Sequence, residues 1–387
     1  MSKSSIEVII IGAGLGGICL AQNLKKNGIV STVHERHHGP AYLAEGFWIE
    51  INDEGTAALR NCLSPKHFEA LMATTQPTNR SDCRWLPRAA LQNCLLQGLE
   101  GIVQFNKTFV RYEKRSDGRV AAFFADGACL IADVLVAADG VHSRVRQQML
   151  PHARRIDTGV LAIGGGAKLS VEIMDVLPPR VFEYPIAVNG PGHQQMFIAV
   201  WLGRPLPRKF VAETDDNGAA EALDDNALGY QVTDHMMWRF AALSSDYGLR
   251  QAPEDVPGSE LKGMVLKMII SWSPQLRRLV ELVDPATIFS LPIRSCVPLE
   301  RWTTGPVTLV GDAIHGMAPY GGFGANTAMR DAAVLGGNLA SADRGEETLL
   351  QAISHYEVEM IGYGFDAARR SMQILQQANR MNPAPLL

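Results

Sequence analysis

The sequence predicts an α/β protein with a doubly wound parallel sheet and a second, strand-rich region inserted into it. Three observations support this fold class. An apolar, β-branched run at residues 6–11 leads directly into a glycine-rich turn. Two more apolar runs, at residues 134–138 and 307–310, each precede an Asp and Gly pair. From about residue 154 helical periodicity gives way to strand candidates, so a second sheet is expected there.

The glycine-rich turn is typical of a Rossmann-like βαβ unit that binds a dinucleotide. Residues 12–17 read GAGLGG, a helical pattern covers residues 16–26, and a second strand at 29–34 ends at Glu35. In such a unit the glycines admit a tight bend and a pyrophosphate, and the acidic residue holds ribose hydroxyls. A plain glycine-rich β-α turn is the alternative. The residues predicted to bind the cofactor here are Gly12, Gly14, Leu15, Gly17, Glu35 and Arg36, the last as a phosphate contact.

Composition excludes several classes of function. The chain has 387 residues, 47% of them apolar and 20% charged, with a formal net charge of -4. No charge excess or basic run indicates a nucleic acid or an anionic membrane as partner. Six cysteines without C-x-x-C pairs indicate free thiols, and His37-His38 and the predicted loop residue His315 lack partners at metal-ligand spacing. With neither a secretory signal nor a membrane segment recognised, we expect a cytosolic protein without a metal.

Local patterns predict the remaining elements in chain order. Strands are expected at 46–52, 102–113, 120–125, 128–131, 160–164, 180–184, 194–202 and 235–243, and helices at 55–63, from 88 onward, 261–271, 275–282 and 325–340. Residues 76–87 read as irregular, the acidic stretch 213–226 as an exposed mobile loop without a catalytic role, and 349–377 as a helical region broken near Gly362 and Gly364. The expected domains are 1–154 with 290–345, then 155–289, then a C-terminal helical region at 346–387.

Four stretches resemble one family. Residues 301–315 (RWTTGPVTLVGDAIH), with Pro319 and residues 321–326 (GGFGAN), resemble the G-D box of class A flavin-dependent monooxygenases, the group similar to p-hydroxybenzoate hydroxylase. Residues 133–146 (DVLVAADGVHSRVR) resemble its D-G box, and residues 88–95 fit its R-x-x-L-x-x-x-L helix. Residues 46–59 resemble its flavin-side strand and helix. The middle of the chain matches only in general texture, and Ile314 and Phe323 depart from the usual pattern near the flavin ring.

The resemblance implies an FAD-binding domain with an inserted mixed β-sheet substrate domain and a C-terminal helix. FAD would be the resident cofactor, and NADPH or NADH a transient one. Independently of the resemblance, a carboxylate at a strand end suits ribityl hydroxyls, and a helix starting at residue 325 would direct backbone donors at the flavin. The further residues assigned to cofactor binding are Gly46, Arg88, Val110, Asp139, Asp312, Pro319, Gly322, Gly324, Ala325 and Asn326.

The activity implied by the resemblance is NAD(P)H- and O2-dependent hydroxylation or epoxidation through a C4a-hydroperoxyflavin. An electron-rich aromatic, indolic or polycyclic small molecule is the expected substrate, and the protein would be a monomer or homodimer. Arg239 and Tyr184 are the candidate catalytic residues on the substrate side, with Trp48 as a further aromatic candidate. Two alternatives remain: an FAD-linked oxidase or dehydrogenase on the same fold, and a non-catalytic flavin-binding redox-sensing protein.

Overall fold

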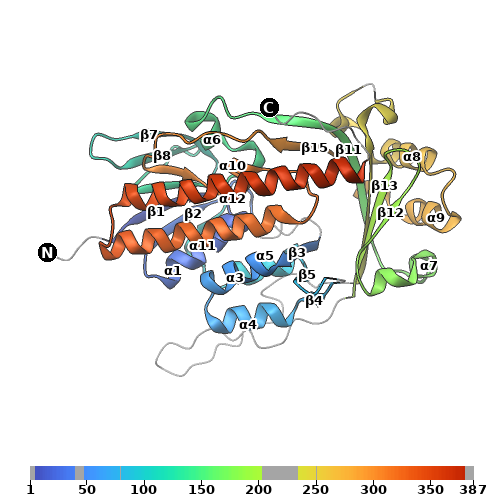
Figure 1. Cartoon of the computed structure of the whole chain (residues 1–387), viewed down its shortest axis with the longest axis horizontal. Coiled ribbons are helices and arrows are strands. Elements are labelled where there is room, and N and C mark those ends of the chain that lie inside the picture. Colours follow the sequence, from blue (N-terminus) through green and yellow to red (C-terminus); the bar gives the residue numbers. More distant parts are fainter. Residues whose placement is uncertain (1–4, 40–47, 79, 203–233, 250, 380–387) are drawn as a thin grey trace.

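A computed structural model describes residues 5–39, 48–78, 80–202, 234–249 and 251–379. Gly46 and the acidic stretch 213–226 lie outside these ranges. Figure 1 shows the arrangement of the elements, with two long helices lying side by side along the molecule and a second sheet at one end. No helix in the described ranges is long and apolar enough to cross a membrane.

The first sheet is parallel throughout and has five strands in the order β16-β10-β1-β2-β6. Its strands are β1 (Glu7–Ile11), β2 (Val30–His34), β6 (Val103–Gln104), β10 (Val134–Ala137) and β16 (Val307–Leu309). The three apolar runs recognised in the sequence are β1, β10 and β16. They are adjacent in the sheet, with β1 at its centre and β16 at one edge. Because parallel strands end at one edge, the turns after β1, β10 and β16 meet there.

Helices and two small sheets complete this half of the protein. The helices are α1 (Leu15–Lys26), α3 (Asp53–Cys62), α4 (Pro65–Ala73), α5 (Arg88–Leu96), α6 (Arg144–Met149), α10 (Asp312–His315), α11 (Phe323–Arg344) and α12 (Leu349–Ala378). One small sheet contains β3 (Trp48–Asn52), β4 (Gln76–Pro77) and β5 (Cys83–Pro87), and the other β7 (Phe109–Lys114), β8 (Val120–Phe124) and β9 (Cys129–Ala132). Residues of these elements form one apolar core, in which β1, β10 and β16 are nearly fully buried.

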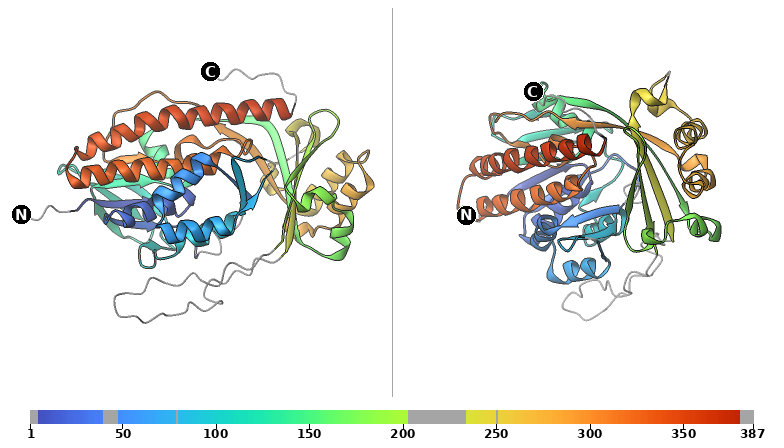
Figure 2. Two further views of the ribbon diagram at one scale, coloured as in Figure 1. Left: turned by 60° about the horizontal axis from the view of Figure 1, so that its bottom comes forward. Right: turned by 45° about the vertical axis from the view of Figure 1, so that its right-hand side comes forward.

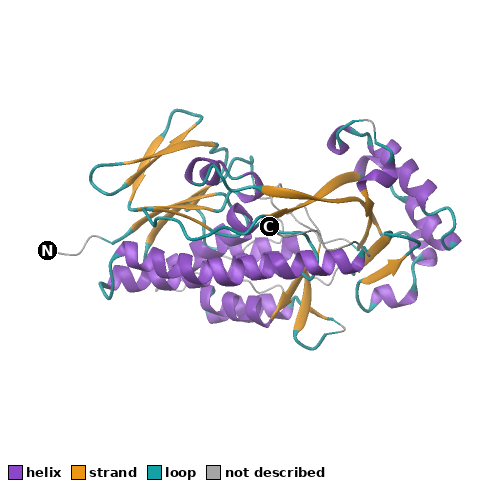
Figure 3. Cartoon of the chain, turned by 45° about the horizontal axis from the view of Figure 1, so that its top comes forward, coloured by secondary structure: helices purple, strands orange, loops and turns teal. Residues whose placement is uncertain are grey.

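The second large sheet has the order β12-β13-β14-β11-β15, and every recorded pairing in it is antiparallel. Its strands are β11 (Arg155–Lys168), β12 (Ile186–Asn189), β13 (Gln195–Trp201), β14 (His235–Leu243) and β15 (Phe289–Cys296). Helices α7 (Val171–Val176), α8 (Gly258–Met268) and α9 (Pro274–Leu282) lie on its outer side, as Figure 2 shows, and share a core with one of its faces. Its other face contacts the C-terminal part of α12 through Met372 and Leu375. Figure 3 shows α12 running from the parallel sheet to this second sheet.

Most predicted elements are confirmed, but several differ from the structure in type or extent. Residues 102–113 form two strands rather than one, β6 in the parallel sheet and β7 in a small antiparallel sheet. Residues 180–184 form no strand, because Pro179–Phe182 is a short 3-10 helix started by proline. Residues 76–87, expected to be irregular, contribute β4 and β5, since pairing with β3 supplies the order that their own pattern lacks. Helix α12 is continuous through Gly362 and Gly364 because tertiary packing outweighs the weak helix propensity of glycine. Helix α11 begins two residues earlier than expected, at Phe323.

Candidate active site

The glycine turn after β1 has the geometry that its sequence predicts. Gly12 has a φ of +100°, and a Cβ atom there would lie 2.4 Å from the carbonyl oxygen of Ala138. A Cβ on Gly17 would lie 2.2 Å from the carbonyl oxygen of Gly12. At Gly14 the nearest atom to such a Cβ is 3.6 Å away. Packing therefore requires glycine at the first and third positions, whereas Gly14 leaves its backbone open to a ligand.

Glu35 connects this turn to the end of β2. Its side chain is only 5% exposed, and its carboxylate accepts hydrogen bonds from the backbone N–H groups of Ala13, at 2.8 Å, and His37, at 3.0 Å. A carboxylate that holds two N–H groups is fixed in position and retains lone pairs for further donors, such as hydroxyl groups.

A cavity of about 210 Å³ lies where β1, β2 and β10 end. Gly12, Gly14, Glu35 and Arg36 line it, together with Phe109 and Asp139. Val110 does not line it, because its side chain points outward from β7 and is exposed. The cavity thus brings together the glycine turn, the acidic strand end and the aspartate of the D-G box.

Asp139 belongs to the side of this cavity formed by the D-G box. One carboxylate oxygen, Oδ2, accepts the N–H of Arg144 at 2.8 Å, while the buried Oδ1 has no partner among the described residues. Burial raises the pKa of Asp139 despite these hydrogen bonds to its charged form. Arg146 donates to the carbonyl oxygens of Val141 and Ala313. The D-G and G-D boxes, far apart in the sequence, are therefore joined directly.

At the G-D box the chain turns through Gly311, with a φ of +61°, into α10, whose first residue is Asp312. The Asp312 side chain is exposed. Arg88, the first residue of α5, lies near enough to interact with it electrostatically: burial lowers the pKa of Arg88, and the Asp312 carboxylate opposes that shift. The structure thus brings together Arg88 and Asp312, both of which the sequence analysis assigns to cofactor binding.

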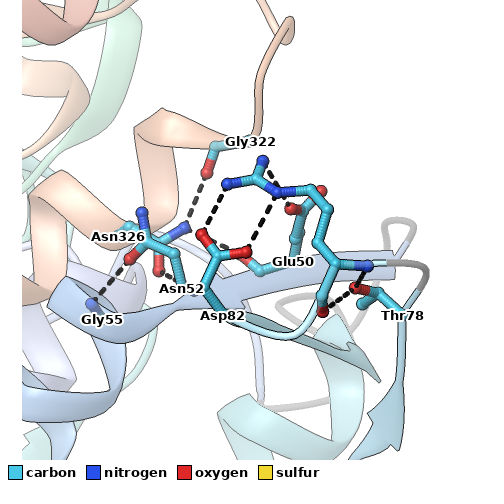
Figure 4. Close-up of polar contacts among 8 residues, drawn as sticks. Glu50, Asn52, Gly55, Thr78, Asp82, Gly322 and Asn326 are labelled. Atoms are coloured by element: carbon cyan, nitrogen blue, oxygen red, sulfur yellow. Dashed lines mark hydrogen bonds and ion pairs between the residues drawn. The ribbon is translucent and has the colours of Figure 1, made fainter.

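Asn326, in the first part of α11, has a structural role that the sequence did not indicate (Figure 4). Its Oδ1 accepts the N–H of Asn52, and its Nδ2 donates to the carbonyl oxygens of Glu50 and Gly322, each at 2.7 Å. A Cβ on Gly55 would lie 2.0 Å from Asn326 Oδ1, so α3 approaches it closely. Asn326 holds β3 against the loop of Pro319 and Gly322, and Gly324 and Ala325 follow that loop in the first turn of α11. Leu15, also assigned to the cofactor, is buried at the start of α1.

A cationic cluster adjoins the cavity, and the sequence indicated only Arg36 and the D-G box residue Arg146 among its arginines. The pKa of His142 is lowered by partial burial and then by the positive charge of four arginines: Arg155, Arg294, Arg36 and Arg146. The buried Nε of Arg155 has no partner among the described residues. Because these residues come from β2, β11, β15 and the D-G box, no sequence window contains them together.

The candidate substrate-side residues do not all meet. Arg239 lies in the middle of β14, and Phe197 of β13 is its partner across the sheet. Both face away from the core shared with α7, α8 and α9, because their strand neighbours point into that core. The guanidinium carbon of Arg239 is 5.7 Å from the ring centre of Phe197 and 5.5 Å from that of Tyr320, which precedes the glycine loop. Tyr184 lies outside any strand, between Phe182 and β12.

Aromatic side chains connect this face of the second sheet with β3. The ring centres of Trp48 and Trp201 are 4.7 Å apart, and those of Trp85 and Phe197 are 6.3 Å apart. Arg239 is deeply set, and burial lowers its pKa, yet part of its side chain remains accessible. A desolvated guanidinium bordered by aromatic rings suits a planar ligand with negative charge.

Comparison with known proteins agrees with this geometry. A family model described as FAD binding domain matches residues 281–359. A solved structure from Photorhabdus luminescens, assigned as an FAD-containing monooxygenase, is 35% identical, with a TM-score of 0.82, and the alignment covers 97% of this chain and 99% of that one. This chain belongs to the class A FAD-dependent monooxygenase family. The fold class and family expected from the sequence motifs are thereby confirmed.

Other relatives of this flavoprotein family differ in length. The dual O-methyltransferase/FAD-dependent monooxygenase elcB of Phaeosphaeria nodorum is 28% identical over 91% of this chain, which spans only 42% of that protein. The 3-amino-4-hydroxybenzoate 2-monooxygenase PtmB3 of Streptomyces platensis is 27% identical, and the match covers 89% of this chain and 82% of that enzyme. The chain therefore spans less than half of some curated relatives and most of others.

The residues of the cavity fit FAD. Gly14 leaves its backbone open, Glu35 offers acceptor sites for ribose hydroxyls, and Asp139, which also lines the cavity, has a buried carboxylate oxygen without a partner among the described residues. The first turn of α11 supplies free backbone N–H groups beside Gly322. These groups include both donors and acceptors of the kind that the phosphate and hydroxyl groups of a dinucleotide require.

Proposed function

We propose that the protein is an FAD-dependent monooxygenase that uses NADPH or NADH and O2 to hydroxylate or epoxidise a planar, electron-rich aromatic compound. The observation that carries this proposal is the link from Arg146 to Ala313, which joins the D-G box beside the cavity to the G-D box. That link supports one continuous site for an extended dinucleotide. When bound, FAD would supply the electron transfer and oxygen activation that no side chain can perform.

The protein's own residues would bind and orient this cofactor. Glu35 would accept the adenosine ribose hydroxyls while it holds the glycine turn, and Asp312 would accept ribityl hydroxyls, with Arg88 balancing its charge. The N-terminus of α11 would place backbone donors near the flavin carbonyl side, where negative charge develops on reduction. The assigned roles of Gly46 and Val110 remain predictions, with Gly46 outside the described residues.

The substrate would bind between Arg239 and the aromatic residues of β3 and β13. Arg239 would orient a carboxylate or phenolate, and the rings of Trp48 and Phe197 would exclude water from the reacting carbon. Trp201 adds a buried indole N–H that has no partner among the described residues. Replacing Arg239 with Gln should raise the KM for an acidic aromatic substrate at least about tenfold while FAD remains bound. Tyr184, which is off the sheet, is the weaker candidate.

The cationic cluster supports a docking place for NADPH or NADH beside the D-G box. Three arginines, Arg36, Arg155 and Arg294, place positive charge close to His142, and the carboxylate of Asp157 lies 4.0 Å from Arg294. A transient nucleotide with several phosphate charges is complementary to such a surface.

The expected domain division also remains a proposal. Because β15 pairs with β11, we now propose that the inserted domain extends to residue 296.

A purified sample tests the proposal directly. The full chain should be yellow, or become so with FAD, and should couple NAD(P)H oxidation in air to a product one oxygen heavier from a panel of phenols, naphthols and indoles. NAD(P)H oxidation that yields only peroxide with every substrate would favour the oxidase alternative, and bound FAD without turnover would favour the redox-sensing one.

The six free cysteines support the expected reducing, cytosolic location, and a monomer or homodimer is the proposed assembly.

A further inference from the structure

A buried group of polar side chains lies beneath the G-D turn, and the proposed flavin site does not use it. Asp331 of α11 and His315, the last residue of α10, are both fully buried, and Asp331 Oδ2 is 2.6 Å from His315 Nε2. Sequence analysis took His315 for a loop residue, which is wrong. No local sequence pattern could have paired these residues, because they are 16 positions apart and lie on two different helices.

The same carboxylate holds the backbone of the turn. Asp331 Oδ2 also accepts the N–H of Gly311 at 2.6 Å, and Oδ1 accepts the hydroxyl of Tyr363, from α12, at 2.8 Å. Gly311 has a φ of +61° and a ψ of -141°, which side-chain-bearing residues rarely adopt. An N–H fixed on a rigid carboxylate therefore sets the direction in which the chain enters Asp312.

Helix α12 fits closely over this group. A Cβ on Gly364 would lie 2.8 Å from His315 Cδ2, so glycine at that position lets α12 pack directly on the imidazole ring. The Arg330 guanidinium carbon lies 4.0 Å from the centre of the Tyr363 ring on the solvent side. Gly364, expected to break the helix, is instead the position at which the helix contacts the turn.

Charge balance favours a charged pair. Burial disfavours the imidazolium form, but attraction to Asp331 and the hydrogen bond between them outweigh it and raise the pKa of His315. A protonated His315 would neutralise Asp331 without solvent. Removal of His315 would leave the Asp331 carboxylate as a single buried charge next to the turn, which proteins tolerate poorly.

We propose that His315, Asp331 and Tyr363 form a positioning group that holds the Gly311–Asp312 turn so that the Asp312 carboxylate faces the ribityl hydroxyls of FAD. This inference rests on the proposed flavin site. The three residues do not contact the cofactor; they act through Gly311 and Asp312. Substitution of any of the three should therefore lower FAD affinity only in a protein that retains the Asp312 carboxylate.

A double-mutant cycle on the full chain tests this dependence. FAD affinity is measured by titrating the deflavinated protein for wild type, Asp312→Ala, His315→Gln and the double variant. Each single change should weaken FAD binding about tenfold, and the double variant should bind no more than about threefold more weakly than His315→Gln. The visible circular dichroism of bound flavin should change in the same way in both single variants. Additive effects, near a hundredfold in the double variant, would overturn the inference.

Glu357→Gln is the matched control. Glu357 is another buried carboxylate on α12, and it accepts hydrogen bonds from Trp302, Thr304 and Thr308. Its substitution should lower thermal stability, yet combine additively with Asp312→Ala in FAD affinity. If the effects of Glu357→Gln and Asp312→Ala on FAD affinity are also non-additive, the coupling reflects a general loss of stability and the inference fails.

Two further outcomes are distinguishable. If His315→Gln does not fold, Tyr363→Phe takes its place, because it removes one hydrogen bond of Asp331 and keeps the ion pair. It should weaken FAD binding about threefold in wild type and not at all in Asp312→Ala; an equal loss in both backgrounds overturns the inference. Wild-type protein that binds no FAD would overturn the proposed function and this inference together, whereas normal FAD binding with additive cycles would overturn the inference alone.

Discussion

Replacing Asn326 with alanine should destabilise the protein and weaken FAD binding. The Asn326 side chain is 2% exposed and makes three hydrogen bonds to backbone groups: the N–H of Asn52 and the carbonyl oxygens of Glu50 and Gly322. At about 1 kcal/mol for each net hydrogen bond, the substitution should cost about 3 kcal/mol. Several of these groups are only partly buried, so water can hydrogen-bond to them in the variant, and the measured loss should be somewhat smaller.

Differential scanning calorimetry of the apo and FAD-loaded protein measures the effect. A loss of at most about 3 kcal/mol corresponds to a fall in Tm of up to roughly 4 °C, because an unfolding entropy of about 2.1 cal/mol/K per residue amounts to about 0.8 kcal/mol/K for a chain of this size. FAD affinity should fall as β3 and the glycine loop separate. Asn338→Ala is the matched control on the same helix, because Asn338 makes a single hydrogen bond of 3.2 Å to Ala352. It should lower Tm by about 1 °C. Equal Tm changes in the two variants would refute the reasoning.

Three further predictions concern individual residues. Glu35→Gln should weaken FAD binding about tenfold in an equilibrium titration, because the amide is a poorer acceptor for Ala13 and for ribose; unchanged affinity would contradict the assignment. Burial, and then the positive charge of Lys107, lowers the pKa of His34 to about 4. Between about pH 6.5 and pH 4 the unfolded state therefore binds a proton that the folded state does not, so the free energy of unfolding should fall as the pH is lowered through that window, by on the order of 2 kcal/mol after screening. Urea titrations of wild type and His34→Gln test this, and an equal acid sensitivity of the two would count against it. Arg294→Ala should raise the KM for NADPH at least about threefold with FAD affinity unchanged, and steady-state kinetics showing the reverse would remove the cationic cluster from nucleotide docking.

Local motifs were sufficient to predict the fold class and family. The apolar runs that became β1, β10 and β16 are recognisable because each strand is buried on both faces and is followed by a turn that only certain residues form. Gly12 and Gly17 could be assigned from the sequence because their constraint is backbone geometry within a few residues. The strand at β4 and β5 was missed for the opposite reason, since its order depends on pairing with β3.

The sequence by itself therefore determined the dinucleotide-binding unit, the flavin motifs and the order of the elements, because these depend on short-range backbone constraints and on hydrophobic periodicity. Only the tertiary structure decided which side chains meet. Asn326 binds backbone groups of β3 and of Gly322, His315 pairs with Asp331, and the arginines around His142 come from four separate segments. Such contacts join residues far apart in the chain, and their existence depends on how the two sheets and α12 pack, which no local pattern encodes.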